Sequence, residues 1–274
     1  MILLKRLLLL LLLSTTFCNA QIILNAENLR VNMLKGKEKW AGNAGVSFSY
    51  IKNTEEIYNI ATNVTVGYNG GENLWMIISN INFSKSGGES FANSGVQHLR
   101  YNRELNDQMA FETFVQGQYD KIFKIDFRGL AGAGARFKLT KPKIKNDSVI
   151  ENSRIYFGTL LMYEYEKASE LDISIISKDF RSSNYLSFSL NPTSNFSVIS
   201  TTYYQPRVDL LKDYRLSSVI DLTFGFASND ESEDKNFWNR LTFNMSFSYN
   251  YDAVPVTSVP KEQYSLANGL KYKF

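Results

Sequence analysis

The chain has 274 residues, of which 44% are hydrophobic and 14% aromatic, and its formal net charge is +3. Its mean hydropathy is slightly negative, at −0.23. A near-neutral chain without a cluster of Lys or Arg is not an electrostatic nucleic-acid binder. The single cysteine excludes an internal disulfide framework.

Residues 1–20 have the three parts of a secretory signal peptide, with a basic start, an apolar run and small residues before the expected cleavage site. The apolar run is too short to span a bilayer as a helix, which takes about 20 residues. Lipidation at Cys18 is the alternative, but Phe17 occupies a position where that site prefers a small residue. We expect cleavage after Ala20, which removes the cysteine and two cations and lowers the net charge to +1.

The residue pattern changes after residue 20. Residues 21–39 are polar with weak periodicity, and we expect a periplasmic N-terminal segment there. Over residues 40–274, short runs of alternating apolar and polar residues are separated by turns. Successive side chains of a strand point to opposite faces, so each run predicts a strand with one apolar and one polar face. No later run reaches the about 18 apolar residues typical of a membrane-spanning helix.

About twelve strands are predicted. They cover residues 44–50, 60–68, 75–83, 93–103, 108–119, 126–138, 154–167, 183–191, 195–205, 214–227, 239–251 and 264–274. Tyr and Phe recur near strand ends, as in the aromatic girdles of outer-membrane barrels, and the strand number is even. We therefore predict an all-β fold, a transmembrane antiparallel up-and-down β-barrel of about 12 strands, in preference to a soluble β-sandwich. Two connections, near 139–153 and 228–238, are long for the side of the barrel that holds the termini.

The polar faces of these strands carry many charges. We expect the following residues to line the lumen: His98, Arg100, Glu112, Arg128, Arg136, Glu164, Arg215, Asp221, Arg240, Lys271 and Lys273. One interpretation is a network of ion pairs that lets the inner wall tolerate charge. The other is a selectivity lining for a narrow water-filled path. Twelve strands lie between the about eight that side chains fill and the about 16–18 that leave an open channel, so width leaves both interpretations open.

Two motifs that could suggest phosphate binding or catalysis are better explained by structural roles. The glycine-rich segment 127–137 is not followed by the helix pattern of a phosphate loop, and its small residues are expected where the wall bends or a side chain approaches. His98 is the only histidine, and Val96 and Arg100 lie two positions away, so no serine nucleophile is placed beside it. We expect no catalytic, cofactor-binding or metal-binding residue.

The last predicted strand has one apolar and one cationic face. Its apolar face consists of Tyr264, Leu266, Leu270, Tyr272 and Phe274. This ending resembles the C-terminal signal by which bacterial outer-membrane barrels are recognised and inserted. The partners expected from it are the barrel-insertion machinery and outer-membrane lipid.

Three segments together resemble a known family: residues 95–102 (GVQHLRYN), 114–120 (FVQGQYD) and 128–136 (RGLAGAGAR). They are similar to the uncharacterised salt-induced outer-membrane protein family, in the form found in Bacteroidota-type, Gram-negative bacteria. The resemblance covers most of residues 40–274, implies a bacterial outer-membrane location and supplies no catalytic residue. We therefore expect a non-enzymatic envelope protein with a narrow or plugged polar lumen. A small-solute or ion channel is the alternative, and a lipid-modifying enzyme is less favoured.

Deletion of Phe274 is expected to reduce the amount of protein in the outer membrane, because it removes the terminal aromatic of the insertion signal. Cell fractionation and immunoblotting measure that amount, with Lys273→Gln as a control that keeps the aromatic. Full recovery of the shortened chain in the outer membrane, or an intact chain that is soluble without detergent, would contradict the barrel prediction.

Overall fold

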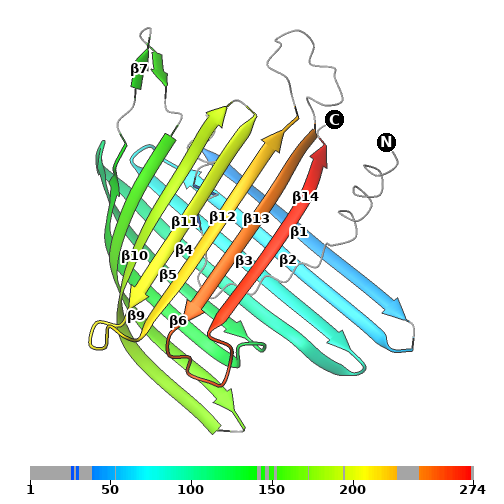
Figure 1. Ribbon diagram of the computed structural model, residues 1–274. Helices are drawn as coiled ribbons and strands as arrows, with labels where there is room; N and C mark the ends of the chain where they lie inside the picture. The colour runs from blue at the N-terminus through cyan, green and yellow to red at the C-terminus, as the bar shows by residue number, and fades with distance from the viewer. Residues whose placement is uncertain are drawn as a thin grey trace.

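Twelve strands form one continuous antiparallel sheet in which each strand pairs with its neighbours along the chain. The computed structural model describes residues 26, 27, 29, 30, 39–52, 54–140, 143–145, 148–150, 153–171, 173–193, 195–226 and 241–272. The sheet curls round into a barrel, with β1 and β14 at the two ends of the strand order (Figure 1). The predicted all-β up-and-down architecture of twelve strands is confirmed.

The twelve strands are β1 (Trp40–Lys52), β2 (Glu56–Asn69), β3 (Asn73–Ser86), β4 (Glu89–Asn106), β5 (Met109–Asp120), β6 (Ile125–Lys138), β9 (Ser153–Glu170), β10 (Ile173–Thr193), β11 (Phe196–Pro206), β12 (Tyr214–Gly225), β13 (Leu241–Asp252) and β14 (Glu262–Tyr272). A separate hairpin, β7 (Lys143–Lys145) and β8 (Ser148–Ile150), interrupts the connection from β6 to β9. This long connection lies at the end of the barrel where β1 begins and β14 ends, here called the terminal end (Figure 1). The opposite end is called the hairpin end.

The largest difference from the predicted strands concerns β10. It was expected over residues 183–191, but it begins at Ile173 and pairs with β9 over its whole first half. Its pairing with β11 starts only at Asn184, apart from one bridge from Arg181. β9 and β10 therefore extend past their neighbours at the hairpin end (Figure 1). Adjacent isoleucines at 175 and 176 break the alternation there, which hid this part of the strand.

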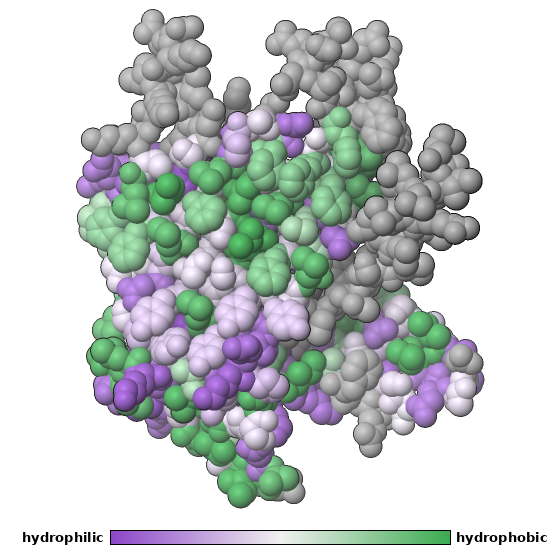
Figure 2. All heavy atoms as spheres, viewed as in Figure 1, coloured by the Kyte–Doolittle hydropathy of each residue, from purple (hydrophilic) through white to green (hydrophobic). Residues whose placement is uncertain are grey.

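Aromatic pairs mark two levels on the outer surface. Near the terminal end, Trp40 packs on Tyr68 with ring centroids 4.8 Å apart. Ten residues further along β1, Tyr50 packs on Tyr58 at 4.9 Å. Ten strand residues rise about 33 Å, which becomes about 25 Å along the barrel axis at the tilt of about 40° typical of membrane barrels. Apolar side chains also gather over the upper half of the wall formed by β10–β14, with more hydrophilic ones below (Figure 2).

Glycines on the inner face make room for aromatic rings. A Cβ at Gly132 would lie 2.7 Å from a ring carbon of Phe114, and a Cβ at Gly158 would overlap the ring of Tyr185. Both rings belong to an apolar cluster inside the barrel. The prediction that the glycine-rich strand receives a neighbouring side chain is thus confirmed at Gly132.

Gly158→Ala is expected to lower the free energy of unfolding by about 1–3 kcal/mol, the usual cost of overpacking, because the new methyl group overlaps the Tyr185 ring. Gly45→Ala is the matched control, since a Cβ at Gly45 would meet nothing within 4 Å. Urea unfolding of the refolded proteins, followed by tryptophan fluorescence, measures both changes. Equal stability of the two variants would contradict a tightly packed interior at Tyr185.

Candidate functional site

Alternation along the strands sends charged side chains into the barrel, and this interior is the candidate site. On β5, Glu112 and Gln116 are buried, whereas Phe111 and Val115 are exposed on the outer face. The buried charges gather in two groups, one toward each end. We call them the terminal network (Glu27, Arg30, Arg100, Glu112 and Arg136) and the hairpin network (Arg128, Glu164, Glu166, Arg181, Asp213, Arg215 and Asp252).

Glu112 is the centre of the terminal network. Its side chain is fully buried, and its Oε1 accepts hydrogen bonds from Arg30 at 2.7 Å and from Arg100 at 3.0 Å. Its Oε2 accepts one from the hydroxyl of Tyr185 at 2.5 Å. Arg100 lies on the adjacent β4, but Tyr185 lies on β10, three strands from β5 in the sheet order. The carboxylate therefore joins wall segments that are not neighbours in the sheet.

A helical turn from the N-terminal region supplies the other partners of this network. The amide of Arg30 donates to the carbonyl of Ala26 at 3.1 Å, and Glu27 lies between them in the turn. Both carboxylate oxygens of Glu27 accept hydrogen bonds from Arg136, at 3.0 and 2.7 Å, in a bidentate pair. Ala26 packs against Ile78 of β3. The described residues of the 21–39 segment thus contact the inner wall of the barrel, while their side of the membrane stays a prediction.

An apolar cluster separates the two networks. It consists of Phe114, Leu130, Leu160, Met162, Tyr185 and Tyr203. Phe114 stacks on His98, with ring centroids 5.5 Å apart. The Nδ1 of His98 lies 2.8 Å from the side-chain oxygen of Gln116, and its Nε2 accepts a hydrogen bond from Arg100 at 3.2 Å. Both ring nitrogens are therefore occupied, and the imidazole joins the cluster to the terminal network.

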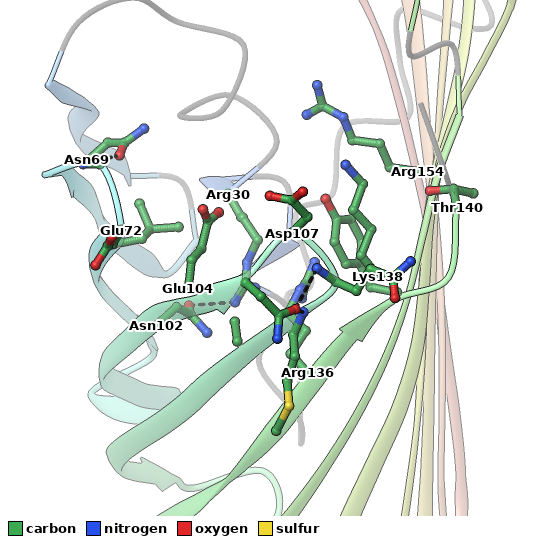
Figure 3. Close-up of a pocket in the computed structure, with 17 residues that line it drawn as sticks. Arg30, Asn69, Glu72, Asn102, Glu104, Asp107, Arg136, Lys138, Thr140 and Arg154 are labelled. Carbon is green, nitrogen blue, oxygen red and sulfur yellow. Dashed lines mark hydrogen bonds between the residues drawn. The ribbon is translucent and has the colours of Figure 1, made fainter. Parts of the chain in front are cut away.

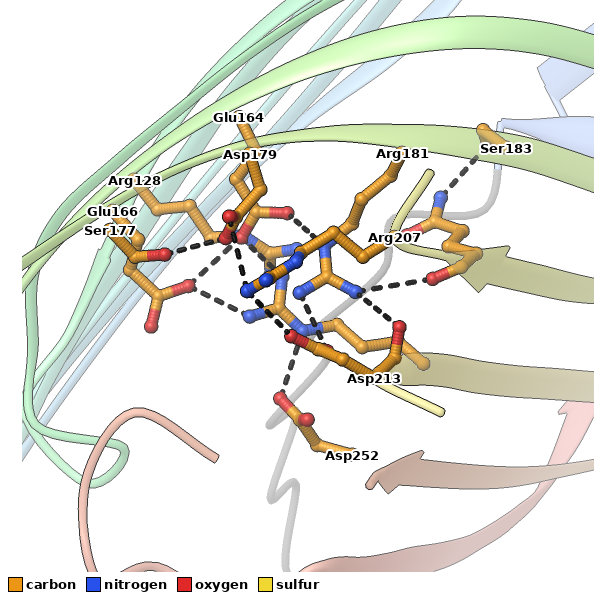
Figure 4. Close-up of polar contacts among 12 residues, drawn as sticks. Arg128, Glu164, Glu166, Ser177, Asp179, Arg181, Ser183, Arg207, Asp213 and Asp252 are labelled. Atoms are coloured by element: carbon orange, nitrogen blue, oxygen red, sulfur yellow. Dashed lines mark hydrogen bonds and ion pairs between the residues drawn. The ribbon is translucent and has the colours of Figure 1, made fainter. Parts of the chain in front are cut away.

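Glu164 holds the hairpin network together (Figure 4). It forms ion pairs with Arg128 and Arg181, each at 3.0 Å, and with Arg215. All four side chains are at most 3% exposed. Buried charges of this kind persist only where opposite charges and hydrogen bonds compensate for lost hydration.

The same network binds the chain segments at the hairpin end. Arg181 donates to Asp213, just before β12, at 2.9 Å. Arg215 donates to Asp252, the last residue of β13, at 2.8 Å and to Glu166 at 3.0 Å. Each of these arginines therefore contacts carboxylates from more than one strand or loop.

The structure places the predicted lumen-lining residues as follows. Seven are buried on the inner face, at 0–4% exposure: His98, Arg100, Glu112, Arg128, Arg136, Glu164 and Arg215. Asp221 is half-buried on β12, Lys271 is exposed on β14, and Arg240 and Lys273 lie outside the described residues. Of the predicted insertion signal, Tyr264, Leu266, Leu270 and Tyr272 are exposed on the outer face of β14, and Phe274 lies outside the described residues.

Several residues of the interior contacts were not predicted. Arg181 lies before residue 183, where its strand was predicted to start, and Tyr185 lies on the same inner face of β10 as Arg181. Glu27 and Arg30 lie three positions apart, the spacing of neighbours on a helical turn. This spacing was their only signal in the sequence. Within the described residues, no helix is both long and apolar enough to cross a bilayer. No group of three or more His, Cys, Asp or Glu among them could hold a metal ion.

These features define a class of protein: a twelve-stranded antiparallel barrel with a charged interior. Residues 42–274 match the family described as "Protein of unknown function, DUF481", and the chain belongs to this family. Among solved structures, the NanC porin in a rhombohedral crystal form is similar over 86% of this chain and 99% of the porin chain, with a TM-score of 0.46 and 12% sequence identity. No curated protein matches the chain.

Glu112→Gln is expected to lower the free energy of unfolding by about 3–5 kcal/mol, because it leaves the buried guanidinium groups of Arg30 and Arg100 without their shared carboxylate. Adding Arg100→Met should recover part of the loss by removing one uncompensated charge. Glu56→Gln is the control, since the Lys52–Glu56 pair is exposed and is expected to contribute little to stability. Urea titration measures all three; a loss at Glu112 no larger than the control would contradict the role of the terminal network.

Proposed function

We propose that this protein is an exported bacterial outer-membrane β-barrel without enzymatic activity, whose lumen is narrowed by its own side chains and by the N-terminal helical turn. The observation that carries the proposal is the filled interior, with two ion networks and an apolar cluster between them. A link to salt response belongs to the same proposal and is supported by the sequence resemblance alone.

The outer face supports a lipid environment. Val46 on β1 is 79% exposed, and Tyr264 on β14 is 78% exposed. Large apolar side chains directed outward from most strands would be unfavourable in water, but they suit the apolar band of a membrane barrel, which is about 25 Å tall. The two aromatic levels on β1 match that height.

The surroundings of His98 support a structural role and not catalysis. General-base chemistry needs an imidazole nitrogen within reach of a nucleophile or substrate. Here Gln116 and Arg100 occupy the two ring nitrogens, and Phe114 covers one ring face. This arrangement favours an envelope protein over a lipid-modifying enzyme.

A narrow channel is the second candidate, because the described residues with inward parity on β1 and β14, the two ends of the sheet order, include small neutral side chains. The inner-face residues of β1 are small and exposed, among them Gly45, Ser47 and Ser49. On β14, the corresponding Ala267 and Gly269 are also exposed. Neutral side chains of this size favour a water-filled path beside these two strands for small solutes or ions.

Planar-bilayer recording of the mature protein refolded into phospholipid separates the two candidates. An occluded lumen gives no stepwise conductance. A path beside β14 gives small steps whose ion selectivity shifts toward cations in Lys271→Glu, because Lys271 is an exposed cation on the inner face of that strand. Lys178→Glu, at an exposed position on β10 near the hairpin end, is the control and should leave selectivity unchanged. Regular openings in the unmodified protein would contradict the occluded lumen.

A further inference from the structure

The two ends of the barrel differ in how they are covered. At the terminal end, a cavity of about 710 Å³ opens beside the terminal network, with Arg30 and Arg136 at its floor (Figure 3). At the hairpin end, the loop of residues 253–261 between β13 and β14 reaches away from its own two strands (Figure 1). The proposed function does not account for this loop.

The loop contacts the side of the barrel that lies opposite its own strands. The hydroxyl of Thr257 donates to the carbonyl of Phe123, in the β5–β6 turn, at 3.5 Å. The amide of Ser258 donates to Glu170, the last residue of β9, at 3.1 Å. In the order of twelve strands, β6 is the sixth and β14 the twelfth, so half the circumference separates them. The loop therefore crosses the hairpin-end mouth of the barrel.

Three polar side chains hold the far side of the loop, and we call them the latch: Lys124, Glu170 and Ser258. The amide and the hydroxyl of Ser258 both donate to the carboxylate of Glu170. The Nζ of Lys124 donates to the same carboxylate at 2.6 Å and to the Ser258 hydroxyl at 3.1 Å. Next to the latch, Thr257 is only 7% exposed.

The base of the loop is fixed in a different way. The amide of Asp252 donates to the carbonyl of Lys261 at 2.9 Å, which closes the loop where it leaves the sheet. The carboxylate of Asp252 accepts a hydrogen bond from Arg215 of the hairpin network. Pro255 and Pro260 restrict the backbone between these points. The loop is therefore a stiff segment with an anchored base.

The contacts at the two places differ in strength. The side chains of Lys124 and Glu170 are 38% and 23% exposed, whereas Arg215 at the base is 3% exposed. Ion pairs that water reaches contribute less than buried ones lose on breaking. Segments held by few, exposed contacts open more readily than the core of a structure. The latch is therefore the first of these contacts to break, while the base stays attached.

We propose that residues 253–261 form a strap that closes the hairpin-end mouth, and that release of Glu170 from Ser258 opens this end of the lumen to solutes. The closed and open states share the anchored base at Asp252. They differ in the contacts of Thr257 and Ser258 with the opposite rim. This closure acts at the other end of the barrel from the N-terminal turn.

Thiol labelling of the refolded mature protein in detergent micelles tests the strap, because cleavage after Ala20 leaves no native cysteine. Thr257→Cys reports the strap, and Phe123→Cys, at a position that is 8% exposed, reports the opposite rim. We expect Glu170→Ala to raise the rate of reaction with a water-soluble maleimide at least about fivefold in both backgrounds, because the charge-assisted hydrogen bonds to the strap are lost. Glu262→Ala, which removes an exposed carboxylate at the first residue of β14, is the control and should leave both rates unchanged.

Equal rates in the Glu170 and Glu262 variants, or a faster reaction at only one of the two reporter positions, would overturn the proposal. A retained electrophoretic shift between heated and unheated samples shows that each variant is folded. Labelling in micelles does not depend on conduction, so a negative result leaves the proposed barrel function standing.

Discussion

The buried carboxylate of Glu112 joins parts of the molecule that are not neighbours in the sheet. Its partners are Arg30 in the N-terminal turn, Arg100 on β4 and Tyr185 on β10. A charge that is fully removed from water is tolerated only while its donors remain in place. The cross-section of the barrel at this level is therefore constrained by one anion, because movement of any one donor leaves that anion less compensated.

The need to compensate buried carboxylates also explains why the buried cations are arginines. The buried cations of the described residues are all arginines: Arg30, Arg100, Arg128, Arg136, Arg181 and Arg215. A twelve-stranded barrel is wider than the about eight strands that ordinary side chains fill, so its interior needs long groups. Arginine reaches across this width and offers five donors in a fixed fork, which lets one side chain serve several carboxylates. Arg215 does so with Glu164, Glu166 and Asp252.

A feature of this barrel could be predicted from the sequence where it depends only on residues close together in the chain. Strand parity is local, so alternation sufficed to assign Glu112 and Glu164 to the polar face. Pairing is not local: Arg128 and Arg136 share one strand and one face, yet they belong to different networks. Which carboxylate each arginine meets depends on the curvature of the whole sheet and on a turn about a hundred residues earlier in the chain, where Glu27 lies. Strand periodicity contains no signal for such contacts.

The N-terminal turn has two roles that cannot be separated. Arg30 binds Glu112 inside the barrel, and with Arg136 it also lines the cavity of about 710 Å³ at the terminal end. If the turn left the barrel, the cavity would lose part of its floor, and Arg136 would lose Glu27. A solute that binds better with the floor present would therefore favour the docked turn by its difference in affinity for the two states. Binding of such a solute and docking of the turn would then be linked through Arg30, and that linkage runs equally in both directions.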